Sequence, residues 1–151
     1  MDNLLTGRRV LVVEDEFFMA ADLEDSLTRA GAEVVGPIPD LQAALAQVHM
    51  NSVDLVVLDV SLRGDEKAYP IADALSERGI PFLFVSGYAS RDLPSRYRKI
   101  RRLEKPFDME ALVKAVGELA HLGAEEPAAQ VSTCLEESNA RGSARAIIIG
   151  L

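Results

Sequence analysis

Five polar residues follow or end short apolar runs, and their types suit the handling of a phosphoryl group. They are Glu14, Asp15, Asp59, Ser86 and Lys105. Three of them are carboxylates, and two carboxylates about 4 Å apart repel by roughly 4 kcal/mol at an effective dielectric constant of 20. If these acids converge they need a cation, and an all-oxygen ligand set suits Mg²⁺, or alternatively Mn²⁺.

Asp59, Ser86 and Lys105 indicate covalent chemistry beside such a metal. A carboxylate nucleophile can form an aspartyl-phosphate, and Asp59 is the candidate because it stands alone in an apolar run. A lysine ammonium and a serine hydroxyl would bind the phosphoryl oxygens. Taken singly, each residue also fits an ordinary structural role, such as an acidic helix start. Their joint placement on successive strand ends favours the functional interpretation.

Apolar runs alternate with segments of helical periodicity through most of the chain. The runs predict five strands, at Val10–Val13, Val34–Val35, Leu55–Val60, Pro81–Val85 and around Leu103. Apolar spacings of three and four residues predict helices over 17–30, from Asp40 to Val48, from Pro70 to Gly79 and from Asp108 to about Gly123. We expect Gly36 and Pro37 to end the second strand.

This alternation predicts an α/β fold on a parallel sheet, because strands that are apolar on both faces must be covered by helices on both sides. Five such units are too few for an eight-stranded barrel. We therefore expect an open, flavodoxin-like, doubly wound sheet in the order 2-1-3-4-5. That order makes the first and third strands neighbours, so Glu14, Asp15 and Asp59 converge. The domain should span residues 5–123, with 124–151 as a C-terminal tail.

The composition excludes several classes of site. The 151 residues carry a net charge of −8 and are 48% hydrophobic, which is ordinary for a soluble globular protein. One cysteine, Cys134, and two histidines, His49 and His121, argue against an internal disulfide and against a Cys/His metal centre. We expect a cytoplasmic protein without membrane contact, because the chain has no signal peptide and no apolar run of about 18 residues.

The segment 90–102 interrupts the pattern. It contains Pro94 and few apolar residues, so we expect a short or mobile helix that switches readily because little apolar burial holds it. Seven of the 16 Lys and Arg residues lie between Arg91 and Lys105. The negative net charge and the lack of an appended helix-turn-helix favour a solvated or protein-docking face over nucleic-acid binding.

From about Arg9 to Leu122 the chain resembles the receiver domain of two-component response regulators. The matching motifs are Val12–Glu16, Leu58–Val60, Val85–Gly87 and Glu104–Phe107. The resemblance implies roles for individual residues: Asp59 as the phosphoacceptor, Glu14, Asp15, Asp59 and the Ser61 main-chain carbonyl as Mg²⁺ ligands, Ser86 as the switch residue, and Lys105 as the phosphate-binding lysine. It also implies a cis peptide bond between Lys105 and Pro106.

Two features depart from the common receiver pattern. Arg102 stands three residues before the lysine, where receivers usually carry an aromatic switch residue, and residues 61–65 replace the usual Met-Pro-Gly loop. The run Pro81–Tyr88 resembles the FAT GUY subfamily, which lacks the aromatic switch. Its members are often stand-alone receivers paired with histidine kinases of the HWE or a related type. Tyr88 is either a substitute switch residue or a surface aromatic, and Arg102 and Pro106 are further auxiliary candidates.

The resemblance implies a single-domain response regulator, not an enzyme, that accepts a phosphoryl group on Asp59 from a sensor histidine kinase. It would signal by contact with a downstream protein or by passing the group to a phosphotransfer protein. Two alternatives stay open. One is a degenerate receiver that only binds partners. The other is a Mg²⁺-dependent phosphohydrolase, although such enzymes usually carry Asp-x-Asp and Asp59-Val60-Ser61 lacks the second acid.

Overall fold

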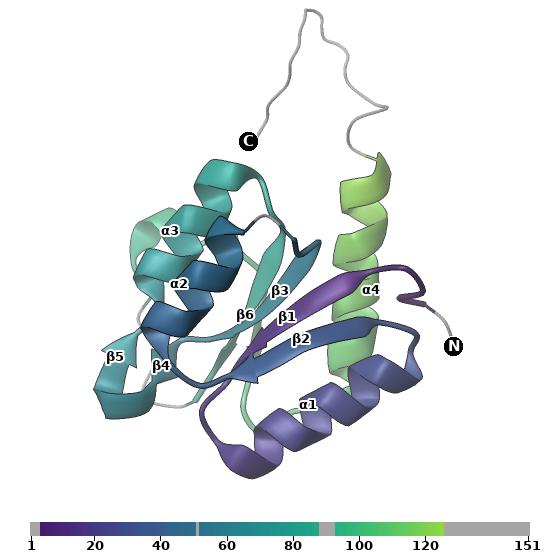
Figure 1. The fold of residues 1–151 in the computed structure, drawn as a ribbon, viewed down its shortest axis with the longest axis horizontal. Coiled ribbons are helices and arrows are strands. Elements are labelled where there is room, and N and C mark those ends of the chain that lie inside the picture. Colours follow the sequence, from purple (N-terminus) through teal and green to yellow (C-terminus); the bar gives the residue numbers. More distant parts are fainter. Residues whose placement is uncertain (1–3, 51, 88–92, 126–151) are drawn as a thin grey trace, which may run out of the picture.

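The computed structural model describes residues 4–50, 52–87 and 93–125, which form a central parallel sheet between two layers of helices (Figure 1). The sheet has five strands: β1 (Arg9–Val13), β2 (Glu33–Ile38), β3 (Leu55–Asp59), β6 (Phe82–Ser86) and β7 (Arg102–Glu104). Their spatial order is β2-β1-β3-β6-β7, and every neighbouring pair is parallel. The predicted fold class and strand order are therefore confirmed.

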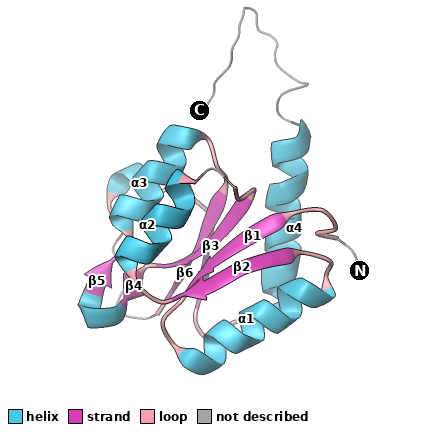
Figure 2. Cartoon of the chain, viewed as in Figure 1, coloured by secondary structure: helices cyan, strands magenta, loops and turns pink. Residues whose placement is uncertain are grey.

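Four helices cover the two faces of this sheet (Figure 2). They are α1 (Phe17–Arg29), α2 (Leu41–His49), α3 (Tyr69–Arg78) and α4 (Met109–Glu125). Val10 and Val12 of β1 pack with the apolar residues of α1 and α4, whereas Leu11 and Val13 pack with those of α2 and α3. This alternation follows from the two-residue period of a strand, and it fixes β1 between both cores. Within the described residues, no helix is both long and apolar enough to cross a membrane.

Two side-chain caps and one glycine fix where three of the helices begin or end. Asp40 accepts a backbone hydrogen bond at the start of α2, and Gly79 ends α3 in the left-handed conformation, both as predicted. At α1 the Glu16 carboxylate accepts hydrogen bonds from the backbone N–H groups of Phe18 and Met19. The chain therefore turns into α1 directly after the acidic pair that follows β1.

The prediction that Gly36 and Pro37 end the second strand is wrong, because β2 continues to Ile38. The register with β1 shifts at this point. Gly36 has φ +94°, and a Cβ placed there would lie 3.0 Å from the Val12 carbonyl oxygen. The Gly36–Pro37 bond is cis. A proline without an N–H is tolerated because β2 is an edge strand with one unpaired side.

The segment after β3 forms an unpredicted hairpin in place of a simple loop. Strand β4 (Ser61–Leu62) pairs antiparallel with β5 (Glu66–Lys67) around the 3₁₀ turn η1 (Arg63–Asp65). Gly64 has φ +74°, which closes the turn without a Cβ penalty. This 61–67 hairpin begins two residues after Asp59, so its position is fixed by the end of β3.

The connection from β6 to β7 is held more firmly than the sequence suggests. Its described part, residues 93–101, contains the 3₁₀ turn η3 (Ser95–Tyr97), in agreement with the expected short helix. Tyr97 is only 2% exposed, and Leu93 and Ile100 pack against the core. The expectation that little apolar burial holds this segment is therefore wrong for residues 93–101. Residues 124 and 125 of the expected 124–151 tail belong to α4, and Tyr88 and residues 126–151 lie outside the described residues.

Candidate functional site

The predicted polar residues meet at the carboxyl edge of the sheet. Glu14 and Asp15 follow β1, Asp59 ends β3 and Lys105 follows β7. The ammonium nitrogen of Lys105 lies 3.1 Å from Asp59 Oδ2 and 3.3 Å from Glu14 Oε2. One oxygen atom from each of Glu14, Asp15 and Asp59 lies within 4.8 Å of the others. We call these three residues the acidic cluster. It unites side chains from two strands that are neighbours only in space.

Burial sets the electrostatics of the acidic cluster. Glu14 is 2% exposed and Asp59 4% exposed, whereas Asp15 is exposed. Burial raises the pKa of Glu14 to about 7, and the hydrogen bond and charge of Asp59 act in the same direction. Burial alone would lower the pKa of Lys105, but the charges of Asp59 and Glu14 outweigh it and raise that pKa. The lysine is thus held as a cation between two carboxylates.

The donor set fits a hard divalent cation. All three candidate ligands offer carboxylate oxygens, which Mg²⁺ and Mn²⁺ prefer. Oε1 of Glu14 is buried 3.3 Å from the Lys105 nitrogen, yet it accepts no hydrogen bond of good geometry from the described residues. A buried carboxylate oxygen without a hydrogen bond is costly, so a cation beside it would supply the missing partner.

Backbone groups hold the two key side chains in place. The Ser61 N–H donates to Asp59 Oδ1 over 3.1 Å, and the Glu16 N–H donates to Glu14 Oε2 over 3.1 Å. The backbone N–H of Lys105 donates to the Ser86 carbonyl over 2.7 Å. Asp59 therefore presents Oδ2 to the lysine while Oδ1 is fixed by the start of the hairpin.

The remaining sequence candidates occupy different environments. Ser86 is 1% exposed at the end of β6, one residue beyond Val85, the register partner of Asp59. Arg102 is exposed at the start of β7 and is paired through its backbone with Phe84. The Lys105–Pro106 bond is cis, so the peptide geometry that the resemblance implies is confirmed.

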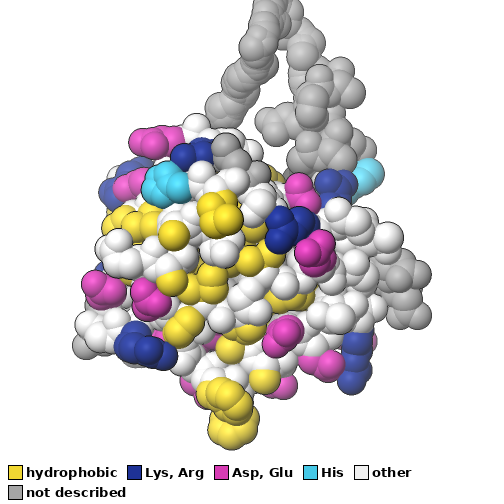
Figure 3. All heavy atoms as spheres, viewed as in Figure 1, with side chains coloured by type: hydrophobic (Ala, Val, Ile, Leu, Met, Phe, Trp, Pro, Cys, Tyr) yellow, Lys and Arg dark blue, Asp and Glu magenta, His cyan; other side chains and the backbone are white. Residues whose placement is uncertain are grey.

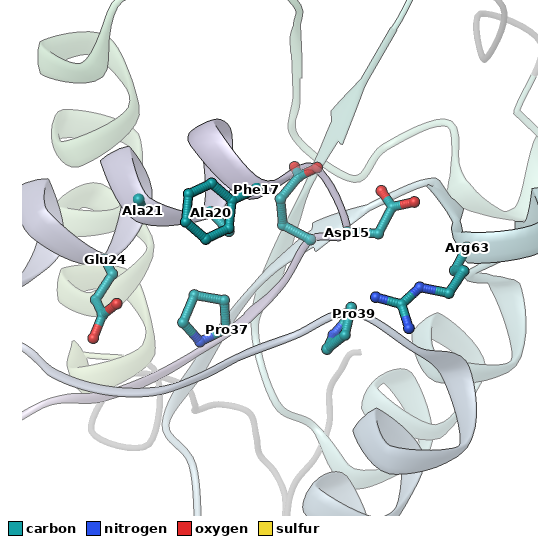
Figure 4. Close-up of a pocket in the computed structure, with 9 residues that line it drawn as sticks. Asp15, Phe17, Ala20, Ala21, Glu24, Pro37, Pro39 and Arg63 are labelled. Atoms are coloured by element: carbon teal, nitrogen blue, oxygen red, sulfur yellow. The ribbon is translucent and has the colours of Figure 1, made fainter.

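A hollow of about 340 Å³ opens beside the acidic cluster (Figure 4). Its lining combines acids, a cation and apolar groups: Glu14, Asp15, Phe17, Ala20, Ala21, Glu24, Pro37, Pro39 and Arg63. Phe17 and Phe18 are 75% and 73% exposed at the start of α1. Figure 3 shows apolar side chains standing out from the surface at that end of the molecule. The site is therefore bordered by an open apolar surface, which the sequence pattern of α1 did not reveal.

Sequence reasoning also missed two groups near the site. Lys67 Nζ donates to Ser61 Oγ over 2.9 Å, and Arg63 enters the lining of the hollow. The positions of both side chains depend on the 61–67 hairpin, which the residue pattern did not predict. The burial of Tyr97 was also not predicted, because its neighbours in the sequence are mostly charged and indicate an exposed segment.

Comparison with known proteins agrees with the fold and the motifs. The family model described as "Response regulator receiver domain" matches residues 10–117. The transcriptional regulatory protein PdtaR of Mycobacterium tuberculosis is 34% identical over 112 residues, which cover 72% of this chain and 55% of PdtaR. This chain thus spans about half the length of that curated relative.

Solved receiver structures cover the same region. The solution structure of SdrG from Sphingomonas melonis Fr1 is 39% identical, covers 77% of this chain and 97% of SdrG, and superposes with a TM-score of 0.62. A second SdrG structure, in the BeF3-activated conformation and attributed to Pseudomonas melonis Fr1, is 41% identical, with coverages of 74% and 95% and a TM-score of 0.63. Taken with the strand order and the converging motifs, these matches show that the chain belongs to the response regulator receiver domain family of two-component systems.

Proposed function

We propose that this chain is a single-domain response regulator that accepts a phosphoryl group on Asp59 from a phosphohistidine of a sensor histidine kinase. The observation that carries the proposal is the contact of Lys105 Nζ with Asp59 Oδ2 at 3.1 Å, inside a cluster of three carboxylates. Asp59 is buried, with Lys105 beside it and two further acids close by. Stability alone poorly explains such an arrangement, because burying charged groups is costly. It is well suited to receive an electrophilic, anionic group.

In the proposed transfer, a carboxylate oxygen of Asp59 attacks the phosphorus of the donor. The new P–O bond makes a mixed anhydride, and the P–N bond to the donor imidazole breaks. The leaving nitrogen keeps the electron pair of that bond and takes a proton from solvent. Because the charge develops on oxygens outside the carboxylate, the groups that face those oxygens decide the rate.

Lys105 and Ser86 are the groups that we assign to the transferred phosphoryl oxygens. The ammonium of Lys105 already contacts the phosphoacceptor, so it can follow the charge onto the phosphoryl group without a large movement. Ser86 is buried at the end of β6 and offers one hydroxyl. Its displacement toward the phosphoryl group would pull on the β6–β7 connection, which gives the phosphorylated state a different surface.

Mg²⁺ is the proposed cofactor, with Mn²⁺ as a chemical substitute. The residues that would hold it are Glu14, Asp15 and Asp59, together with the main-chain carbonyl of Ser61. When bound, the ion supplies positive charge that offsets the repulsion between the acids and the incoming phosphoryl group. Glu14 and Asp15 come from the same turn after β1, so a single backbone segment would position two of the ligands.

The proposed partners follow from the family. Receivers generally interact with histidine kinases and with downstream proteins, and SdrG, whose whole chain is nearly covered, is a receiver of similar size. The Pro81–Tyr88 run supports the FAT GUY subfamily and a kinase of the HWE or a related type. We propose that the protein acts in the cytoplasm by contact with a downstream protein or a phosphotransfer protein, without binding nucleic acid or membrane and without enzymatic turnover.

The test is a mass measurement of the whole chain. Wild-type protein incubated with Mg²⁺ and acetyl phosphate should gain one phosphoryl group, and Asp59→Asn and EDTA-treated wild-type protein should gain none. Asp54→Asn is the matched control, because Asp54 lies just before β3, at the opposite end of that strand, and binds the Arg9 backbone there. A wild type that never gains mass, or an Asp59→Asn variant that still does, contradicts the proposal. Steady release of inorganic phosphate from a phosphate monoester, and not only from acetyl phosphate, would favour the phosphohydrolase.

A further inference from the structure

The acidic cluster repels the very group that it is proposed to receive. Its three carboxylates and the Lys105 ammonium leave two formal negative charges at the carboxyl edge of the sheet. A phosphodonor carries close to two negative charges on the reacting group. A bound divalent ion only brings the cluster to neutrality. The neutral cluster exerts no net long-range attraction on the donor, so positive charge elsewhere on the rim would favour its approach.

The 61–67 hairpin carries one such charge at Lys67. Ser61 and Lys67 are register partners in the hairpin, and the Lys67 ammonium donates to Ser61 Oγ over 2.9 Å. The backbone N–H of the same serine donates to Asp59 Oδ1. Ser61 thus contacts both Lys67 and the phosphoacceptor. The side chain of Lys67 stays exposed to solvent. That combination holds a cation at the rim without burying it in the cluster.

Arg63 places a second cation on the rim. It lines the hollow together with Glu14 and Asp15, and Figure 4 shows its guanidinium extending toward the hollow below the Asp15 carboxylate. Gly64, in the left-handed conformation, is the residue that turns the chain directly after Arg63. The hairpin therefore presents one cation on the hollow and one beside Ser61.

Glu66, the acidic residue in the strands of this hairpin, lies on the face opposite Lys67, because successive side chains of a strand lie on opposite faces. Glu66 pairs with Leu62, which is buried, whereas Lys67 pairs with Ser61 beside the phosphoacceptor. Of the two charged residues in the strands of the hairpin, the lysine thus lies on the side of Ser61 and the glutamate on the opposite side.

We propose that Arg63 and Lys67 are positioning residues that attract and orient the phosphoryl group of an anionic donor before Asp59 attacks it. This inference rests on the proposed function. The donor class is a phosphoramidate or acyl phosphate, whose P–N or P–O bond breaks as the Asp59–phosphorus bond forms. The leaving group keeps the bonding electron pair. Arg63 and Lys67 take no part in bond making. They act only on how often the donor meets the site and on how its phosphoryl group is oriented there.

The experiment measures phosphorylation and metal binding in Arg63→Gln, Lys67→Gln and the double variant. At low ionic strength the second-order rate constant with phosphoramidate should fall about three- to tenfold for each charge removed, and the deficit should shrink as salt is added. Mg²⁺ affinity, measured by calorimetry without any donor, should stay the same or increase, because a nearby positive charge opposes cation binding. Arg63→Lys and Lys67→Arg should restore most of the rate.

Arg29→Gln is the matched charge control. Arg29 ends α1, at the opposite end of that helix from the acidic cluster, and is exposed beside Asp25. Its removal should change neither quantity.

The outcomes separate this inference from the proposed function. Wild-type protein that takes up no phosphoryl group refutes the proposed function. Wild-type protein that is phosphorylated, with both glutamine variants reacting at its rate, refutes this inference alone. A joint fall of rate and Mg²⁺ affinity also overturns it, because that pattern indicates a hairpin that merely supports the site.

Discussion

The hydroxyl of Tyr97 donates a hydrogen bond to the Asp73 carboxylate, and this contact fastens the β6–β7 connection to helix α3. The ring of Tyr97 stacks on Tyr69 with centroids 5.6 Å apart and meets the edge of Phe84 at 5.5 Å. Arg96 binds both carboxylate oxygens of Asp73. One side chain thus links the segment between the two proposed phosphate ligands, Ser86 and Lys105, to the neighbouring helix α3 on the same face of the sheet.

We expect Tyr97→Phe to lower the free energy of unfolding by about 1–2 kcal/mol, because it removes one hydrogen bond to a charged acceptor. Tyr97→Ala should lower it by about 3–5 kcal/mol, since it also leaves a cavity between α3 and β6. Urea denaturation followed by circular dichroism measures both. Tyr69→Phe is the control, because it keeps the stacked ring. Equal losses in Tyr69→Phe and Tyr97→Phe would show that the Asp73 contact is not the source.

The same cluster predicts a dependence of stability on alkaline pH. Burial, reinforced by the Asp73 carboxylate, raises the pKa of Tyr97 from 10.0 to about 12. A raised pKa means that the folded state holds the phenolic proton more tightly than the unfolded state does. The resulting stability is complete below pH 10 and is lost as the pH rises toward 12. Wild-type protein should therefore lose stability across this interval more steeply than Tyr97→Phe.

Ultraviolet titration of tyrosinate gives an independent measurement. The chain has three tyrosines, and the last of them to ionise in the folded wild type should be absent from Tyr97→Phe. If the two proteins show the same late titration, the raised pKa belongs to another residue.

Gly36 offers a test of the unpredicted course of β2. A Cβ at this position would lie 2.8 Å from the Ile38 nitrogen and 3.0 Å from the Val12 carbonyl oxygen, with φ at +94°. Gly36→Ala should therefore lower the free energy of unfolding by about 2–4 kcal/mol, from strain and displaced backbone. Gly79→Ala is the control, because φ is also positive there but nothing lies within 4 Å of the added Cβ. Its loss should be about 1 kcal/mol. Similar losses at both positions would refute the close approach of the backbone at Gly36.

Sequence reasoning was most successful where a residue's role depends on local pattern. Strand ends are defined by apolar runs, so the convergence of Glu14, Asp15, Asp59 and Lys105 followed once the strand order was inferred. Asp40 and Gly79 were equally predictable, because capping depends on neighbours a few residues away.

It was less successful where tertiary contacts override local signals. The Gly36–Pro37 pair is a turn signal in most contexts, but β1 pairs with the chain on both sides of it. The 61–67 hairpin has strands of two residues, which are too short for any periodic pattern. Tyr97 sits among arginines, and only the tertiary structure shows that its ring faces the core.

The crowding of the acidic cluster predicts how stability responds to the metal. In EDTA, Asp59→Asn should be at least as stable as wild type, because it removes one of the charges that raise the pKa of Glu14 and disfavour its ionised form. Addition of Mg²⁺ at ten times its dissociation constant should stabilise wild type by about 1.4 kcal/mol, from ligand binding to the folded state alone. Asp59→Asn should gain less, because a neutral amide is a weaker ligand.

Thermal unfolding with and without Mg²⁺ measures both effects. Asp22→Asn is the control, because Asp22 is an exposed acid on α1 that belongs to no acidic cluster among the described residues. It should respond to Mg²⁺ as wild type does. A wild type that Mg²⁺ does not stabilise, or an Asp59→Asn variant that gains as much, would show that the metal does not bind at the acidic cluster. Functional sites commonly sacrifice stability for activity. If the acidic cluster is such a site, Asp59→Asn should be more stable than wild type without Mg²⁺ and should accept no phosphoryl group.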